Sequence, residues 1–233
     1  MNYPVSPNRD TLIAVARQLS PLLPEVVFVG GQVAELLITD PAATRVRPTR
    51  DVDVVVAAAS RLEYRRIEER LTELGLTHDT SEDAPMCRWR ARSGHLVDVM
   101  SQDEAVLGFS NRWYALALQR SVEHELEEGL TIRIPTAPIY IATKWDAFLN
   151  RGNADYLRSH DLEDIIAVVA GRPELLHEVR EETEPLQQWL SDQIATFLLE
   201  ETSTYALEGA LPDASQIPEL LTDVRSRFET LVI

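Results

Sequence analysis

Cysteine and lysine are almost missing from this sequence, which has one residue of each, Cys87 and Lys144. A single cysteine cannot form a disulfide within the chain, and neither it nor the five histidines show the spacing of zinc ligands. No apolar run approaches the roughly 18 residues of a membrane-spanning helix, and the first residues lack the pattern of a signal peptide. We therefore expect a soluble cytoplasmic protein with no disulfide, zinc site or membrane segment.

Positive charge is also scarce, because the net charge is −16. Residues 1–110 carry 12 arginines and 16 acids, whereas residues 111–233 carry ten basic residues and 22 acids. Such a field repels nucleic acid at long range, so an RNA substrate would require a local basic patch. Arginines between residues 45 and 92 could supply one, although a solvated surface is the commoner fate of such residues. The sequence also lacks a P-loop, a G-x-G-x-x-G motif and the residue pattern of a nucleophilic hydrolase.

Helical and strand patterns alternate over the first hundred residues. Apolar residues at helical spacing predict the helices, and short β-branched runs predict the strands. Ser60 and Glu63 form a capping-box pattern at the start of one helix. The predicted helices are residues 10–19, 32–38 and 61–74, and the predicted strands are residues 26–29, 52–56, 86–90 and 96–100. The last two strands should pair as a hairpin, because the turn-like sequence of residues 92–94 joins them.

Beyond residue 101 helical patterns dominate. They cover residues 139–149, 161–170, 174–182, 186–207 and 218–231, and the one strand pattern there is residues 130–134. An α/β front half therefore leads into a mainly helical back half. We place the domains at residues 1–102 and 103–233, with a soft boundary because no linker composition marks it.

The strongest chemical signal lies in the segment from Arg47 to Val56, which reads R-P-T-R-D-V-D-V-V-V. Alternation along a strand places Asp51 and Asp53 on one face, two residues apart. Like charges held that close are costly unless a cation lies between them, and Mg²⁺ prefers carboxylate oxygens together with substrate phosphates. Asp98, inside a later apolar strand, also requires a partner or a cation, so it could complete the cluster.

Gly30 and Gly31 follow one strand and precede a helix, so their N–H groups could approach phosphate oxygens without a Cβ in the way. Taken alone, the pair also fits a tight strand-to-helix turn, and a lone D-x-D also fits a strand end with two solvated acids. The order of the three features argues for function. A glycine pair after a strand, an Asp-x-Asp in the next strand and an acid in a later strand is hard to obtain by chance.

Gly30-Gly31, Asp51-Val-Asp53 and Asp98 resemble the pattern of the DNA polymerase β-like nucleotidyltransferases. That resemblance implies a small mixed sheet flanked by helices in residues 1–102. It also implies that Asp51, Asp53 and Asp98 hold Mg²⁺ or Mn²⁺ against a nucleoside triphosphate, with Asp98 nearest the acceptor as general base. Gly30 and Gly31 would contact the phosphates.

More narrowly, residues 29–37 and 47–56 resemble the AbiEii/AbiGii toxin family, which includes the MenT toxins and whose typical motif is R-x-[ST]-x-D-x-D. Arg47 and Thr49 match the first two fixed positions of that motif, so they are assigned to the nucleotide site. The resemblance covers residues 26–170, approximately, and residues 171–233 match no family.

A second motif of that family is a helical lysine, an arginine about seven residues later and a D-x-x-D-like stretch, which Lys144, Arg151, Asp161 and Asp164 resemble. The resemblance implies that Lys144 contacts the triphosphate as a catalytic residue and that Asp161 positions the triphosphate or the lysine. A lone lysine among 21 arginines suits a compact ammonium on a phosphate, although chance could also explain it. A salt bridge from Asp161 or Asp164 to Arg151 or Arg158 is the structural alternative.

The function implied is transfer of a nucleoside monophosphate from a triphosphate to an acceptor hydroxyl. In the toxin family the acceptor can be the 3′ end of tRNA, and a cognate antitoxin can be a partner. Because the net charge is −16, a protein hydroxyl or an aminoglycoside-like molecule is an alternative acceptor. A non-catalytic nucleotide-binding partner is the third reading.

Overall fold

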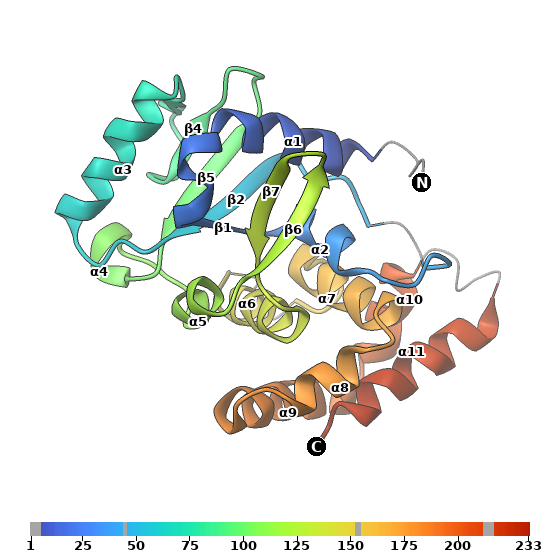
Figure 1. Cartoon of the computed structure of the whole chain (residues 1–233). Coiled ribbons are helices and arrows are strands. Elements are labelled where there is room, and N and C mark those ends of the chain that lie inside the picture. The colour runs from blue at the N-terminus through green and yellow to red at the C-terminus, as the bar shows by residue number, and fades with distance from the viewer. Residues whose placement is uncertain (1–5, 44–45, 152–154, 212–216) are drawn as a thin grey trace. The chain divides into compact units, whose positions relative to one another are not determined.

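The computed structural model describes residues 6–43, 46–151, 155–211 and 217–233 (Figure 1). By their contacts the residues form two compact units. The sheet unit comprises Met1–Val33 and Arg47–Thr136, and the helical unit comprises Ala34–Val46 and Ala137–Ile233. The domain division at residue 102 stays a prediction. Residues 103–136 cluster with the sheet unit in this structure.

The sheet unit is built on a five-stranded mixed sheet with the order β1-β2-β5-β4-β3. Its strands are β1 (Val26–Val29), β2 (Asp51–Val56), β3 (Thr77–His78), β4 (Arg88–Arg90) and β5 (Leu96–Ser101). The pair β2 and β5 is parallel, and all other neighbours are antiparallel. Figure 1 shows β1, β2, β5 and β4 lying side by side. The predicted α/β class, the strands of the first half and the β4–β5 hairpin are confirmed.

Helices α1 (Pro7–Gln18), α3 (Arg61–Glu73), α4 (Glu104–Leu107) and α5 (Tyr114–Gln119) belong to the sheet unit, with the 3-10 helix η1 (Ser20–Glu25). Helix α3 begins as its capping pattern predicts, because the Glu63 N–H donates to the Ser60 hydroxyl at 3.3 Å. The Tyr64 hydroxyl donates to the Val99 carbonyl oxygen at 2.7 Å and so fixes α3 to β5. Burial raises the pKa of this hydroxyl, which stays protonated at neutral pH.

A second, two-stranded sheet also belongs to the sheet unit. It pairs β6 (Val122–Glu127) with β7 (Leu130–Ile134) in antiparallel register. The sequence predicted β7 but not β6, whose residues Val-Glu-His-Glu-Leu-Glu are too polar to give a strand pattern. Strand β7 contacts β1, and both strands of the hairpin contact α1. Strand β6 is therefore stabilised by its pairing with β7 and not by a buried apolar face.

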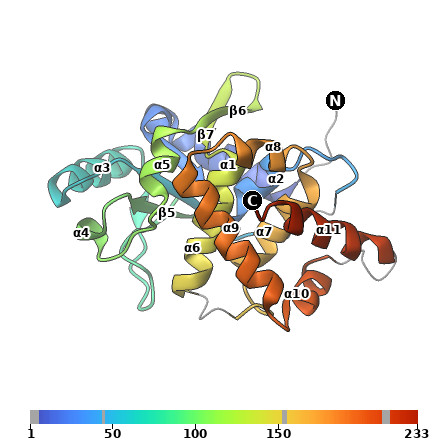
Figure 2. The same ribbon diagram turned by 90° about the horizontal axis from the view of Figure 1, so that it is seen from below.

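The helical unit packs its helices around an aromatic centre. They are α6 (Ala137–Arg151), α7 (His160–Gly171), α8 (Leu175–Arg180), α9 (Glu184–Leu199), α10 (Ser203–Ala210) and α11 (Pro218–Thr230). Phe197 on α9 contacts the rings of Trp145 and Phe228, and all three side chains are buried. Figure 2 shows α9, α10 and α11 grouped with α7, which contacts both α10 and α11.

One helix prediction in this unit is wrong. Residues 186–207 were expected to form one helix, but α9 ends at Leu199 and α10 begins at Ser203. Glu200 has an extended backbone (ψ 132°), so the helix ends there. The apolar spacing of the sequence nevertheless continues on both sides of this residue. The apolar periodicity could not reveal the break, because no glycine or proline marks it.

Within the described residues, the helices are all too short or too polar to cross a bilayer.

Candidate functional site

Three aspartates meet on one face of the five-stranded sheet, and we call Asp51, Asp53 and Asp98 the acid cluster. Asp53 of β2 is directly opposite Asp98 of β5 in the parallel register. Asp51 lies two residues before Asp53 and so points to the same face, whereas Val52 and Val54 are buried on the other. The strand alternation and the β2–β5 pairing together bring the three predicted residues to one place.

Gly30 makes room for one of these carboxylates. Its φ is +75°, a left-handed conformation that favours glycine, and Val29 before it pairs with Asp53. A Cβ at Gly30 would lie 2.0 Å from Asp53 Oδ2, so the carboxylate occupies the space of a missing side chain. Gly31 begins α2 (Gly31–Leu37). Contact of Gly30 and Gly31 with phosphate stays a prediction, but the need for glycine at position 30 has a structural cause here.

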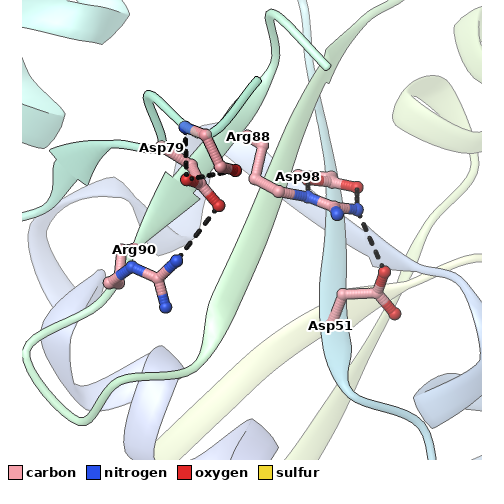
Figure 3. A network of polar contacts seen from close by, with 6 residues as sticks. Asp51, Asp79, Arg88, Arg90 and Asp98 are labelled. Carbon is pink, nitrogen blue, oxygen red and sulfur yellow. Dashed lines mark hydrogen bonds and ion pairs between the residues drawn. The ribbon is translucent and has the colours of Figure 1, made fainter. Parts of the chain in front are cut away.

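Arg88 is the residue that sequence reasoning missed in this site. It stands opposite Asp98 in the antiparallel β4–β5 register, and its guanidinium binds both carboxylate oxygens, from Nε at 2.8 Å and from Nη2 at 2.6 Å. The same Nη2 donates to Asp51 Oδ2 at 3.2 Å (Figure 3). Bidentate pairs between a guanidinium and a carboxylate are among the stronger charge-assisted hydrogen bonds. The bonds to Asp98 raise the pKa of Arg88 still further above its ordinary value.

Cys87 precedes Arg88 and faces the interior. Its side chain is buried, and this burial, reinforced by the Asp98 carboxylate, raises the pKa of the thiol to about 12. The thiol is therefore protonated at neutral pH and cannot act as a thiolate nucleophile.

Asn8 fixes the loop that leads into β2. Its Nδ2 donates to the Arg47 carbonyl oxygen at 3.0 Å, and its Oδ1 accepts from the Thr49 N–H at 2.9 Å. The Asn8 side chain is buried, and both hydrogen bonds are partly shielded from water. One side chain of α1 thus holds both predicted loop residues, Arg47 and Thr49, at two backbone positions directly before Asp51. No motif in the sequence singled out Asn8.

Substitution of Asn8 by alanine should destabilise the protein by about 2–6 kcal/mol, because two partly buried backbone groups lose their partners at roughly 1–3 kcal/mol each. Urea unfolding measures this cost. Thr11→Ala is the control, because its hydroxyl bonds only to the Pro7 carbonyl within the same helix. Equal costs for the two variants would show that Asn8 does not hold the loop.

Two polar side chains in the segments before Asp51 have buried atoms with no hydrogen-bond partner among the described residues. They are Gln32, whose amide nitrogen and oxygen are both buried directly after Gly31, and Thr49, whose hydroxyl is buried two residues before Asp51. Native proteins rarely leave such groups unpaired, and each one requires an explanation such as water, an ion or a ligand. Both precede Asp51 in the sequence, Gln32 by 19 residues and Thr49 by two.

The residue types of the acid cluster fit a hard divalent cation, because carboxylate oxygens are the ligands that Mg²⁺ prefers. The three aspartates do not form a complete metal site in this structure. Among residues 6–43, 46–151, 155–211 and 217–233, no three acids, histidines or cysteines are placed together to hold a metal ion. Both oxygens of Asp98 are bonded to Arg88 instead. A metal role for Asp51, Asp53 and Asp98 therefore stays a prediction.

In the helical unit, Lys144 of α6 is buried between two carboxylates of α7. Its Nζ lies 3.0 Å from Asp161 Oδ1 and 2.7 Å from Asp164 Oδ2. The Lys144 side chain is 8% exposed and that of Asp164 is 1% exposed. Both acids thus pair with Lys144, and among the described residues the alternative pair with Arg158 does not form. The side chain of Arg151 lies outside the described part of the chain.

No protein-family model and no curated protein sequence matches the chain. Among solved structures, it is similar to an antigenic nucleotidyltransferase-like protein from Paracoccidioides brasiliensis, with 18% sequence identity and a TM-score of 0.50. The similarity covers 93% of this chain and 92% of that protein. The chain therefore has a nucleotidyltransferase-like fold, with a five-stranded mixed sheet, flanking helices and a helical C-terminal region.

Proposed function

We propose that this chain is a metal-dependent nucleotidyltransferase, which moves a nucleoside monophosphate from a triphosphate to an acceptor hydroxyl. One observation carries the proposal. Asp53 and Asp98 are directly opposite each other in neighbouring strands, with Asp51 on the same face, inside a nucleotidyltransferase-like fold. Carboxylates on one face of neighbouring strands repel one another unless a cation offsets their charge, and the single guanidinium of Arg88 offsets only part of it.

In the proposed reaction the acceptor oxygen attacks the α-phosphorus, the bond from that phosphorus to the β-bridging oxygen breaks, and pyrophosphate leaves. Bound Mg²⁺ or Mn²⁺ would supply Lewis acidity and offset the charge of the phosphates. Asp51 and Asp53 are the residues that would hold it, and Asp98 would accept the proton of the acceptor hydroxyl. In the sheet unit, Gly30, Gly31, Arg47 and Thr49 are proposed to contact the nucleotide, whereas a contact from Lys144 and Asp161 rests on the family resemblance alone.

Two classes of acceptor hydroxyl are compatible with this chemistry. The resemblance to the AbiEii/AbiGii toxins favours the 3′ end of tRNA, with growth inhibition as the consequence and an antitoxin as a regulating partner. The net charge of −16 favours a different acceptor, because it attracts cationic molecules and repels RNA. A protein hydroxyl or an aminoglycoside-like compound is therefore the alternative acceptor for the same chemistry.

A second candidate function is nucleotide binding without transfer. Arg88 favours it, because this side chain holds both oxygens of Asp98, the proposed general base. Such a protein would bind a triphosphate but leave it intact.

The acceptor is tested by incubating the purified protein with each of four nucleoside triphosphates labelled at the α-phosphate, with Mg²⁺ and total tRNA. Parallel reactions contain an aminoglycoside or no added acceptor. The Asp51→Ala, Asp53→Ala double variant should transfer no label. Asp79→Asn is the matched control, since Asp79 pairs with Arg90 outside the acid cluster (Figure 3).

Label on tRNA that depends on Asp51 and Asp53 would establish an RNA nucleotidyltransferase. Label only on the drug or on the protein would move the acceptor to that class. Triphosphate binding without any transfer would favour the second candidate function.

A further inference from the structure

Arg88 neutralises part of the acid cluster without any added ion. Its guanidinium bonds to both oxygens of Asp98 and reaches one oxygen of Asp51. The Arg88 and Asp98 side chains are 23% and 11% exposed, so water screens this pair only partly. The Asp51 side chain is more exposed to solvent than those of Arg88 and Asp98, at 38%.

The Arg88–Asp98 pair joins two neighbouring strands of the sheet. Arg88 and Asp98 are opposite residues of neighbouring antiparallel strands. The bond from the Val99 N–H to the Cys87 carbonyl oxygen, at 2.9 Å, fixes the backbone beside them. The planar guanidinium makes two hydrogen bonds to this carboxylate at once, so less side-chain entropy is lost per bond.

We propose that Arg88 is a resident counter-ion of the acid cluster, which prevents tight retention of a divalent cation until a nucleoside triphosphate is bound. The inference rests on the proposed function, because it takes the acid cluster to be the metal site. A divalent cation held by Asp51 has to compete with a guanidinium that already bonds to one oxygen of this carboxylate and to both oxygens of the neighbouring Asp98. A triphosphate adds several negative charges and further oxygen ligands, and these shift the competition toward the cation.

Removal of the guanidinium should therefore strengthen metal binding in the absence of nucleotide. Mn²⁺ is the probe, and electron paramagnetic resonance measures the free ion in titrations of the full-length protein. We expect Arg88→Gln to bind Mn²⁺ at least tenfold more tightly than the wild type. Arg90→Gln is the matched control, because Arg90 lies on the same strand and pairs with Asp79 instead (Figure 3). Equal or weaker Mn²⁺ binding by Arg88→Gln would overturn the proposal.

A measurement on the wild type covers the case in which Arg88→Gln does not fold. Mn²⁺ is titrated with and without a triphosphate analogue that cannot be cleaved between its α- and β-phosphates, after correction for binding by the analogue alone. We expect the analogue to tighten Mn²⁺ binding to the protein at least tenfold. Tight Mn²⁺ binding by the wild type without the analogue would overturn the proposal.

The triple variant Arg88→Gln, Asp51→Asn, Asp53→Asn separates this inference from the proposed function. Loss of the gained Mn²⁺ affinity in the triple variant would place the ion at the acid cluster, whether or not nucleotide transfer is found. Retention of that affinity would place the ion elsewhere and overturn the inference. If the wild type transfers nucleotides while Arg88→Gln gains no Mn²⁺ affinity, the inference fails and the proposed function stands.

Discussion

Replacement of Gly30 by alanine should reduce nucleotide transfer by about 100-fold or more, the loss that a displacement near 1 Å can cause in a catalytic group. The new methyl group would start 2.0 Å from Asp53 Oδ2, so the carboxylate has to move. The left-handed backbone adds strain of about 1–2 kcal/mol. Steady-state transfer rates and urea unfolding, measured on the same preparations, separate the two effects.

Gly94→Ala provides the matched control for this prediction. Gly94 has a comparable φ of +87°, but a Cβ there meets nothing within 4 Å. Both variants should therefore lose similar stability from backbone strain, while Gly94→Ala should keep its transfer rate. If the two variants lose activity equally, the position of the Asp53 carboxylate over Gly30 is not what the reaction requires.

Lys144→Met should destabilise the protein by about 3–5 kcal/mol, the range for removing one partner of a buried ion pair. The ammonium lies within 3.0 Å of Asp161 and Asp164, and the Asp164 side chain is 1% exposed. Without the lysine, these carboxylates would have to be protonated or to draw water into the interior. Urea unfolding should report the loss, and Lys144→Met, Asp164→Asn should regain part of it because a buried charge is removed.

Arg225→Met serves as the comparison, because Arg225 and Glu229 form an exposed ion pair on α11. Its cost should be at most about 1 kcal/mol. A normal unfolding curve for Lys144→Met, together with a raised KM for the triphosphate, would instead favour the contact with substrate that the family resemblance implies. The two readouts thus distinguish a structural lysine from a substrate ligand.

Local patterns predict most of the sheet, because its strands are short β-branched runs with clear ends. The run Asp51–Val56 lies in the predicted position, and its alternation correctly places Asp51 and Asp53 on one face. The pairing of β2 with β5 could not be derived from such patterns, since α3, β3 and β4 lie between these two strands in the sequence. That pairing is what brings Asp98 to the other two acids.

The pairing of Arg88 with Asp98 could have been predicted from the sequence. The hairpin was predicted around residues 92–94, and Arg88 and Asp98 are each five residues from Ser93. Equal distance from the turn predicts that the two residues face each other across the hairpin. Asn8 was not predictable in this way, because its partners lie 39 and 41 residues away and are backbone groups. Only the folded chain brings α1 to the loop before Asp51.

The central claim is that the acid cluster supports transfer of the α-phosphate with its nucleoside. The most direct test compares triphosphates labelled at the α- or the γ-phosphate, with the wild type and the Asp51→Ala, Asp53→Ala variant, in the presence of Mg²⁺. We predict that α-label becomes attached to an acceptor and γ-label is released as pyrophosphate, only with the wild type. Attachment of γ-label, release of single phosphate, or equal turnover by the double variant would contradict a nucleotidyltransferase at this site.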